Sequence, residues 1–173
     1  MSRTTPWSFY DLFVVPNLQD FLDDPTSIRK SVNAAVSAFQ MADIMYKFYE
    51  RSDPSKISAW PTQTEFLKFL SAREPSFLTL HSVATAYKHL YTNKGFYEIP
   101  SSGDLYVLDV PGAELTQAWQ FDERGSPQPP GDVFVRRRGK PDKSMTTALK
   151  EVVEGMWPAV LPDESGLPPY RMG

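Results

Sequence analysis

Apolar residues recur with helical spacing along most of the first half of the chain. Between residues 27 and 51, two apolar stripes merge into one wide arc, which is typical of a central helix contacted on more than one side. We therefore predict that residues 27–51 form the most buried helix. The two stripes consist of Ile28, Val32, Ala35, Val36, Phe39, Ala42, Tyr46 and Tyr49, and of Ala34, Ala38, Met41, Met45 and Phe48. Of these side chains, we expect Phe39 and Met45 to lie in the core.

Local signals predict three more helices. Thr62 and Glu65 have capping-box spacing, which favours a helix from there to about residue 73, and Pro75 then breaks it. Apolar residues at helical intervals predict helices over residues 76–92 and 144–157, the second ended by Pro158.

The start of the chain has a weaker pattern. Residues 1–16 are interpreted as an irregular arm anchored by aromatic side chains. Asn17 is the expected N-cap of a short helix over residues 18–22, after which Pro25 interrupts the chain.

Beyond residue 95 the pattern changes to strands. Residues 96–99, 105–110, 115–121 and 133–135 are predicted strands, and residues 124–131, with three prolines, are a predicted loop. Because a two-stranded hairpin is only marginally stable alone, the sheet should pack on the helices.

These elements predict a mainly α, α+β fold: a helical bundle core with a small antiparallel β-sheet and a C-terminal helix. We expect a single domain over residues 1–173. Its parts would be a helical half, 17–93, then the sheet and closing helix, 96–157, and an irregular tail, 158–173.

Composition restricts the kind of protein. The 173 residues are 41% hydrophobic and 13% aromatic, which is enough for a core. The absence of cysteine excludes disulfides and thiolate metal sites and fits a cytoplasmic protein. The apolar run at residues 12–15 is too short for a signal peptide or a membrane span, so no membrane partner is expected.

The two histidines, His81 and His89, fall on one predicted helix. Eight residues separate them by about 12 Å along the axis and roughly 80° around it. They cannot share a metal ion without other ligands, so we expect no metal, and no nucleotide-cofactor motif is present. Either both histidines lie on a solvated face with Ser82, Thr85 and Lys88, or that face lines a groove in which His89 acts as a general base or oxyanion donor.

Two segments of the helical half resemble an uncharacterised group of bacterial proteins similar to HEPN domains (higher eukaryotes and prokaryotes nucleotide-binding). They are residues 27–39 (Ser-Ile-Arg-Lys-Ser-Val-Asn-Ala-Ala-Val-Ser-Ala-Phe) and the helix end Ala-Tyr-Lys-His at 86–89. A sheet and a terminal helix after the Lys-His pair fit the same pattern. The resemblance implies a helical core whose helices commonly pair across a homodimer.

The chain departs from the family's active ribonucleases at one motif. Those enzymes share an Arg-x4–6-His motif, in which Arg and His meet the scissile phosphate without a metal. No arginine precedes His89 at that spacing, and Arg73 precedes His81 by one step too many. Only His89 carries over. The resemblance therefore implies a non-catalytic module.

A basic run follows the last predicted strand. Residues 136–143, Arg-Arg-Arg-Gly-Lys-Pro-Asp-Lys, carry five positive charges. With strand alternation, Arg136 and Arg138 share one face, and Lys140 and Lys143 would extend it into a phosphate-binding patch. The alternative is a solubilising surface turn. The net charge of −3 confines any nucleic-acid binding to such a local patch.

The leading hypothesis is therefore a non-catalytic HEPN-like binding module for RNA, a nucleotide or a protein. One alternative is a metal-independent endoribonuclease that uses His89, assisted by Lys88 or His81. Another is a structural protein that self-associates through its aromatic surface. Whether Lys88 and His89 face an open cleft or plain solvent discriminates between the first two.

Overall fold

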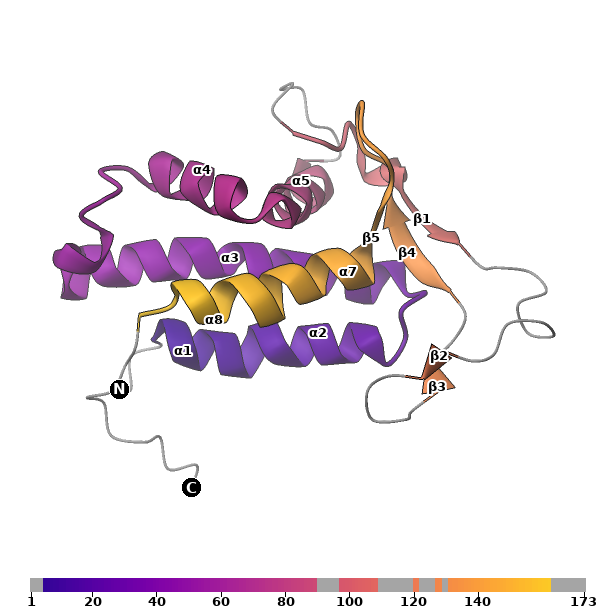
Figure 1. Ribbon diagram of the computed structural model, residues 1–173, viewed down its shortest axis with the longest axis horizontal. Helices are drawn as coiled ribbons and strands as arrows, with labels where there is room; N and C mark the ends of the chain where they lie inside the picture. Colours follow the sequence, from indigo (N-terminus) through magenta and orange to yellow (C-terminus); the bar gives the residue numbers. More distant parts are fainter. Residues whose placement is uncertain (1–4, 90–96, 109–119, 122–126, 129–130, 163–173) are drawn as a thin grey trace.

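Helix α3, Ile28–Ser52, is the central element of the computed structural model, which describes residues 5–89, 97–108, 120–121, 127–128 and 131–162 (Figure 1). Ser27 begins it by accepting the Lys30 N–H on its side chain, and its buried alanines let neighbouring helices approach closely. Met45 is buried as predicted. Phe39 is only half-buried, so its predicted place in the core is wrong.

Two helices cover one side of α3, above it in Figure 1. After a short 3-10 turn, η2 (Pro54–Ile57), they are α4 (Gln63–Arg73) and α5 (Pro75–His89). The capping box of α4 is confirmed, because the Glu65 N–H donates to Thr62 Oγ1 at 3.2 Å and the Thr62 N–H donates to Glu65 Oε2 at 3.0 Å. The predicted end of α5, residues 90–92, lies outside the described residues.

On the opposite side of α3 lies a helix where an irregular arm was predicted (Figure 1). It runs without a break through α1 (Pro6–Phe9), the π-helical turn η1 (Tyr10–Val14) and α2 (Val15–Leu22). Thr5 and Ser8 cap its start reciprocally, and proline suits the first helical turn. The irregular arm and the Asn17 cap are therefore wrong, since Asn17 is inside the helix.

The last helix is also longer than predicted. It consists of α7 (Met145–Lys150), the π-helical turn η4 (Glu151–Met156) and α8 (Trp157–Val160), and it continues past Pro158. Ser144 begins it by accepting the Thr147 N–H at 3.1 Å. The indole N–H of Trp157 donates to the Ala38 carbonyl at 3.1 Å, which joins this helix to α3.

Both helices keep their course past a proline by means of a π-helical turn. Val15 donates its N–H five residues back to the Tyr10 carbonyl, just before Pro16, and Trp157 does the same to Val152, just before Pro158. Because Pro158 has no N–H, the Val153 carbonyl lacks its helical donor. The Tyr10 hydroxyl replaces that donor at 2.7 Å in a buried bond between the first and last helices.

Two small antiparallel sheets complete the α+β fold, which matches the predicted class. The larger has the order β1-β4-β5, with Leu105 opposite Val135 and Phe134 opposite Ser144. The smaller pairs β2 with β3, which lies in the predicted 124–131 loop. The strands are β1 (Leu105–Leu108), β2 (Gln120–Phe121), β3 (Pro127–Gln128), β4 (Asp132–Val135) and β5 (Lys143–Ser144), with a 3-10 turn, η3 (Ser102–Asp104), before β1.

Residues 97–99 form no strand, contrary to the prediction. Residue 96 and residues 109–119, which include parts of two other predicted strands, lie outside the described residues. No strand forms at residues 97–99 because the Glu98 N–H is taken by the Ser82 hydroxyl of α5 at 3.0 Å and the Glu98 carbonyl by the Arg138 N–H at 2.7 Å. The segment is thus held by a side chain and a turn rather than by a neighbouring strand. None of the helices in the described ranges is long and apolar enough to cross a bilayer.

Candidate functional site

A cleft of about 560 Å³ lies between α3 and α5, and we call it the α3–α5 cleft. Each helix contributes one stripe at intervals of three and four residues, and Tyr97 adds a wall from outside the helices. The lining residues are Val36, Phe39, Gln40 and Asp43 of α3, His81, Ala84, Thr85, Tyr87, Lys88 and His89 of α5, and Tyr97. The three residues predicted for a ribonuclease site, His81, Lys88 and His89, therefore border one cleft.

His81 lies at the aromatic end of this cleft and is buried. Its ring stacks on Phe39 with 4.2 Å between centroids and 11° between planes, and Tyr97 meets it edge-on at 5.2 Å. Burial lowers the pKa of His81 to about 4, so the imidazole is neutral at physiological pH. The hypothesis that His81 and Ser82 lie on a solvated face is wrong, because both side chains are buried.

Lys88 and His89 are exposed at the end of α5, where they border the cleft. They share it with Asp43, a half-buried acid on α3 whose pKa is raised by burial and lowered in part by a hydrogen bond from Gln63 and by the charge of Lys88. The cleft thus combines aromatic walls with a cation, an acid and an exposed imidazole. These are groups that orient a polar ligand.

Sequence reasoning missed Asp43 as a site residue, although a signal for it was present. At about 100° per residue, Asp43 falls between Phe39 and Val36 in the apolar arc of α3. A charged residue inside an otherwise apolar arc marks a place where the arc faces a wet cleft rather than the core. Tyr97, by contrast, reaches the cleft only through the tertiary fold.

The residue after Tyr97 joins the cleft to the basic run, residues 136–143, which we call the basic turn. Glu98 is a buried carboxylate that accepts hydrogen bonds from Thr79 of α5 at 2.5 Å and from Lys140 of the basic turn at 2.6 Å. Arg137 adds an ion pair to Glu98 at 3.8 Å. A buried charge requires such partners, and these hold the basic turn beside the wall of the cleft.

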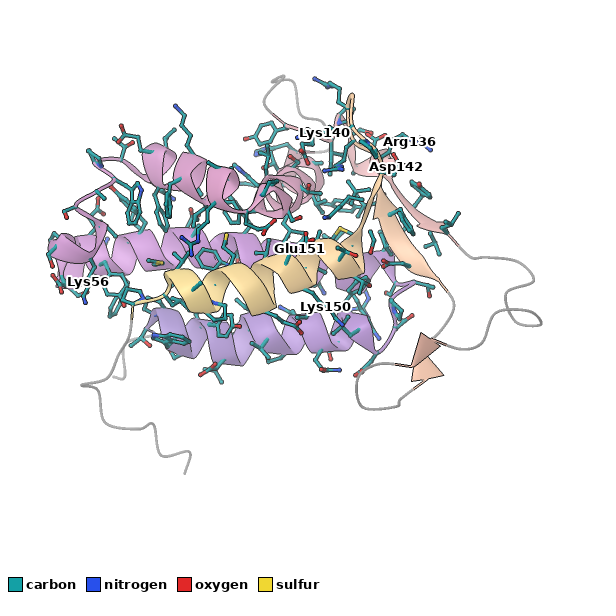
Figure 2. All side chains as sticks on the ribbon, viewed as in Figure 1. Lys56, Arg136, Lys140, Asp142, Lys150 and Glu151 are labelled. Atoms are coloured by element: carbon teal, nitrogen blue, oxygen red, sulfur yellow. The ribbon has the colours of Figure 1, made fainter. Side chains whose placement is uncertain are left out.

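The remaining charges of the basic turn have different surroundings. Arg136 and Arg138 are exposed and Arg137 is half-buried. Strand β4 ends at Val135, so the three arginines follow the strand and the predicted strand alternation does not extend to them. Arg136 lies over the ring of Tyr106 at 5.4 Å, and Lys143 pairs with Glu151 at 2.8 Å. Within the described part of the chain, Arg138 has no ion pair. Figure 2 shows Arg136, Lys140 and Asp142 together at the tip of the sheet.

No group of three or more histidine, aspartate or glutamate side chains that could hold a metal ion occurs among residues 5–89, 97–108, 120–121, 127–128 and 131–162. The α3–α5 cleft is lined by aromatic rings, hydrogen-bonding groups and single charges.

Comparison with known proteins adds no relative to this description: no protein-family model, no curated protein and no solved structure matches the chain.

Proposed function

We propose that the protein is a non-catalytic module that binds single-stranded RNA. In this proposal one nucleotide occupies the α3–α5 cleft and the adjoining phosphates lie along the basic turn. The observation that carries it is the pair Tyr97 and Glu98: Tyr97 lines the cleft, and the next residue is bound to Lys140 and Arg137. The two regions that the sequence singled out separately are therefore neighbours.

The cleft suits a nucleotide in both size and chemistry. Its volume of about 560 Å³ lies within the usual range for small-molecule sites, roughly 300–1,000 Å³. Unpaired bases stack on aromatic side chains, and Phe39, Tyr87 and Tyr97 supply rings here. Lys88 supplies an exposed cation for a phosphate, and Gln40 and Asp43 supply hydrogen-bonding groups for a base edge.

Few positively charged side chains are available to contact the phosphates of an RNA strand. Lys140 and Lys143 are already paired with Glu98 and Glu151, whereas Arg136 and Arg138 remain exposed. Together with Lys88 they provide three phosphate contacts, which is a small number for a molecule of net charge −3. We therefore expect affinity in the micromolar range or weaker, with log affinity falling against log salt at a slope of roughly −2 to −3.

The test is a titration of fluorescein-labelled oligouridylate by anisotropy over a series of salt concentrations. Replacing Arg136 and Arg138 with glutamine should flatten the salt slope by about one to two units, and Lys88→Gln should weaken binding. The matched control is the double change Lys56→Gln and Lys150→Gln. It also removes two positive charges, but at exposed positions remote from the tip of the sheet (Figure 2).

Equal effects of the two double variants would show that only net charge matters and would refute a site at the basic turn. No salt-dependent binding by the unaltered protein at low ionic strength would refute the RNA proposal altogether.

A second candidate, a metal-independent endoribonuclease, is favoured by the discriminating observation: Lys88 and His89 border an open cleft rather than plain solvent. It stays second because no arginine precedes His89 at the Arg-x4–6-His spacing of the active ribonucleases. His89 would then act as general base, with Lys88 in place of the missing arginine. Cleavage of single-stranded RNA in the presence of a chelator, abolished by His89→Ala but not by Lys150→Gln, would put this function first.

A further inference from the structure

The first helix exposes large apolar side chains on the side away from the core. Leu12, Phe13 and Val15 expose 60, 50 and 40% of their surfaces, and the half-buried ring of Phe9 contacts Phe13 with 5.1 Å between centroids. We call these four residues the N-helix face. Scattered exposed apolar residues are common, but four that adjoin one another on a helix indicate a contact surface.

The other side of the same helix is fully used by the fold. Tyr10, Val14, Leu18 and Phe21 are buried against the rest of the molecule. The first half of the helix is therefore apolar on both sides. A helix of that kind is normally covered on both sides, and here the core covers one of them. The exposed side of the helix is therefore expected to be buried by a binding partner.

The negative charge of the first helix indicates which kind of partner would bind the N-helix face. Asp11, Asp20 and Asp23 are exposed on the helix, and residues 5–26 contain no lysine, arginine or histidine. The exposed charges of the first helix are thus all carboxylates.

These exposed aspartates argue against two other binding partners for the N-helix face. A second copy of the chain, pairing through the same face, would bring its carboxylates against these. An anionic membrane surface would be repelled in the same way. We infer that the N-helix face binds a basic amphipathic helix of another protein, with apolar side chains on Leu12 and Phe13 and lysines or arginines against the aspartates.

This inference does not depend on the RNA proposal. The N-helix face belongs to the helix on the opposite side of α3 from α5, as Figure 1 shows, so the two surfaces can be tested separately.

The experiment uses the full chain and two labelled synthetic helical peptides with the same leucine stripe, one with lysine and one with glutamate at every polar position. We expect the lysine peptide to bind and the glutamate peptide not to. The double change Leu12→Ser and Phe13→Ser should weaken binding by about tenfold or more, because two central apolar contacts are lost. The control is Leu108→Ser, which alters another exposed apolar residue outside the face.

Four results would overturn the inference. They are equal binding of both peptides, no effect of the Leu12 and Phe13 changes, a dimer in light scattering that these changes dissociate, and binding to phosphatidylglycerol vesicles that they abolish. Circular dichroism of the double variant checks that the helix is retained. If the helix is lost, the double variant Asp11→Asn and Asp20→Asn is used instead. The lysine peptide should then bind this variant more weakly and with less dependence on salt.

Discussion

Phe39 shows how one residue can follow the apolar pattern of a helix and still belong to a site. It lies within the apolar arc of α3, yet its ring is half-buried because it forms a wall of the α3–α5 cleft. Its stacking partner is His81. The sequence placed His81 on a polar arc, whereas in the fold it is stacked on Phe39 and met edge-on by Tyr97. At this scale the sequence predicts helical faces well, but it does not tell which face borders a cleft.

The exposure of Phe39 has a measurable consequence for stability. Phe39→Ala should reduce the free energy of unfolding by about 1–2 kcal/mol, less than the usual cost for a buried aromatic, because part of its surface is already in water. The matched control is Phe77→Ala, a neighbouring ring that is fully buried, for which we expect about 3–5 kcal/mol. Both losses are measured by urea denaturation, and equal losses would place Phe39 in the core after all.

The buried imidazole of His81 should make stability depend on pH. Its pKa in the folded protein, about 4, is below its ordinary value of 6.5 because burial disfavours the charged ring. Between these two values the unfolded chain binds a proton that the folded chain does not. The free energy of unfolding should therefore fall as pH falls through this window, by about 3 kcal/mol from this group.

Asp43 and Asp132 act in the opposite direction, because burial raises their pKa values and the folded state then binds protons more readily. The measurement is accordingly a comparison of urea denaturation for the unaltered protein and for His81→Phe, from neutral pH to about pH 4. The variant should lose less stability over this range. Parallel curves for the two proteins would mean that His81 is not titrating as its burial requires.

At the scale of elements, local signals explain which predictions succeeded. Helices α3 and α4 were predicted because their caps and apolar periodicity lie within the helix itself. The first helix and the extension past Pro158 were missed because proline is a breaker by local rules. At the second of the two π-helical turns, the missing helical donor is replaced by Tyr10, 143 residues away in the chain, which no local rule predicts. The Thr5 and Ser8 capping box was the available signal for the first helix.

The bond from the Tyr10 hydroxyl to the Val153 carbonyl allows a test of this account. Tyr10→Phe should reduce the free energy of unfolding by about 1–2 kcal/mol, because it leaves a buried carbonyl without a donor. In a Pro158→Ala background the new N–H at position 158 can donate to that carbonyl, so the same change should cost less. Urea denaturation of the four proteins gives the coupling energy directly. Additive losses would show that the proline and the tyrosine are unrelated.

The whole molecule has two surfaces on opposite sides of α3: the α3–α5 cleft with the basic turn, and the apolar N-helix face (Figure 1). The sequence identified Lys88, His89 and the basic run as candidates, since each carries a local signal. It could not place them together, because their connection runs through Glu98, whose partners come from α5 and from the basic turn. Nor could it foresee that Lys140 and Lys143 would each pair with a carboxylate.

The expectation that the chain is one domain can be tested through a bond between its two halves. The Val133 N–H of β4 donates to the carbonyl of Pro25, in the connection between α2 and α3, at 3.0 Å. Val133 and Val135 are fully buried, and Glu98 joins the same sheet region to α5. Because these contacts cross from sheet to helices, the sheet should not open while the helices stay folded.

Native-state hydrogen exchange measures this directly. The amide of Val133 and that of Ala42, buried in the middle of α3, should exchange with free energies that agree within about 1 kcal/mol and equal the global free energy of unfolding. Both values should fall together as denaturant is added, since each then requires complete unfolding. If Val133 exchanged at a much lower free energy that did not depend on denaturant, the sheet would open on its own, and the chain would be two cooperative units rather than one.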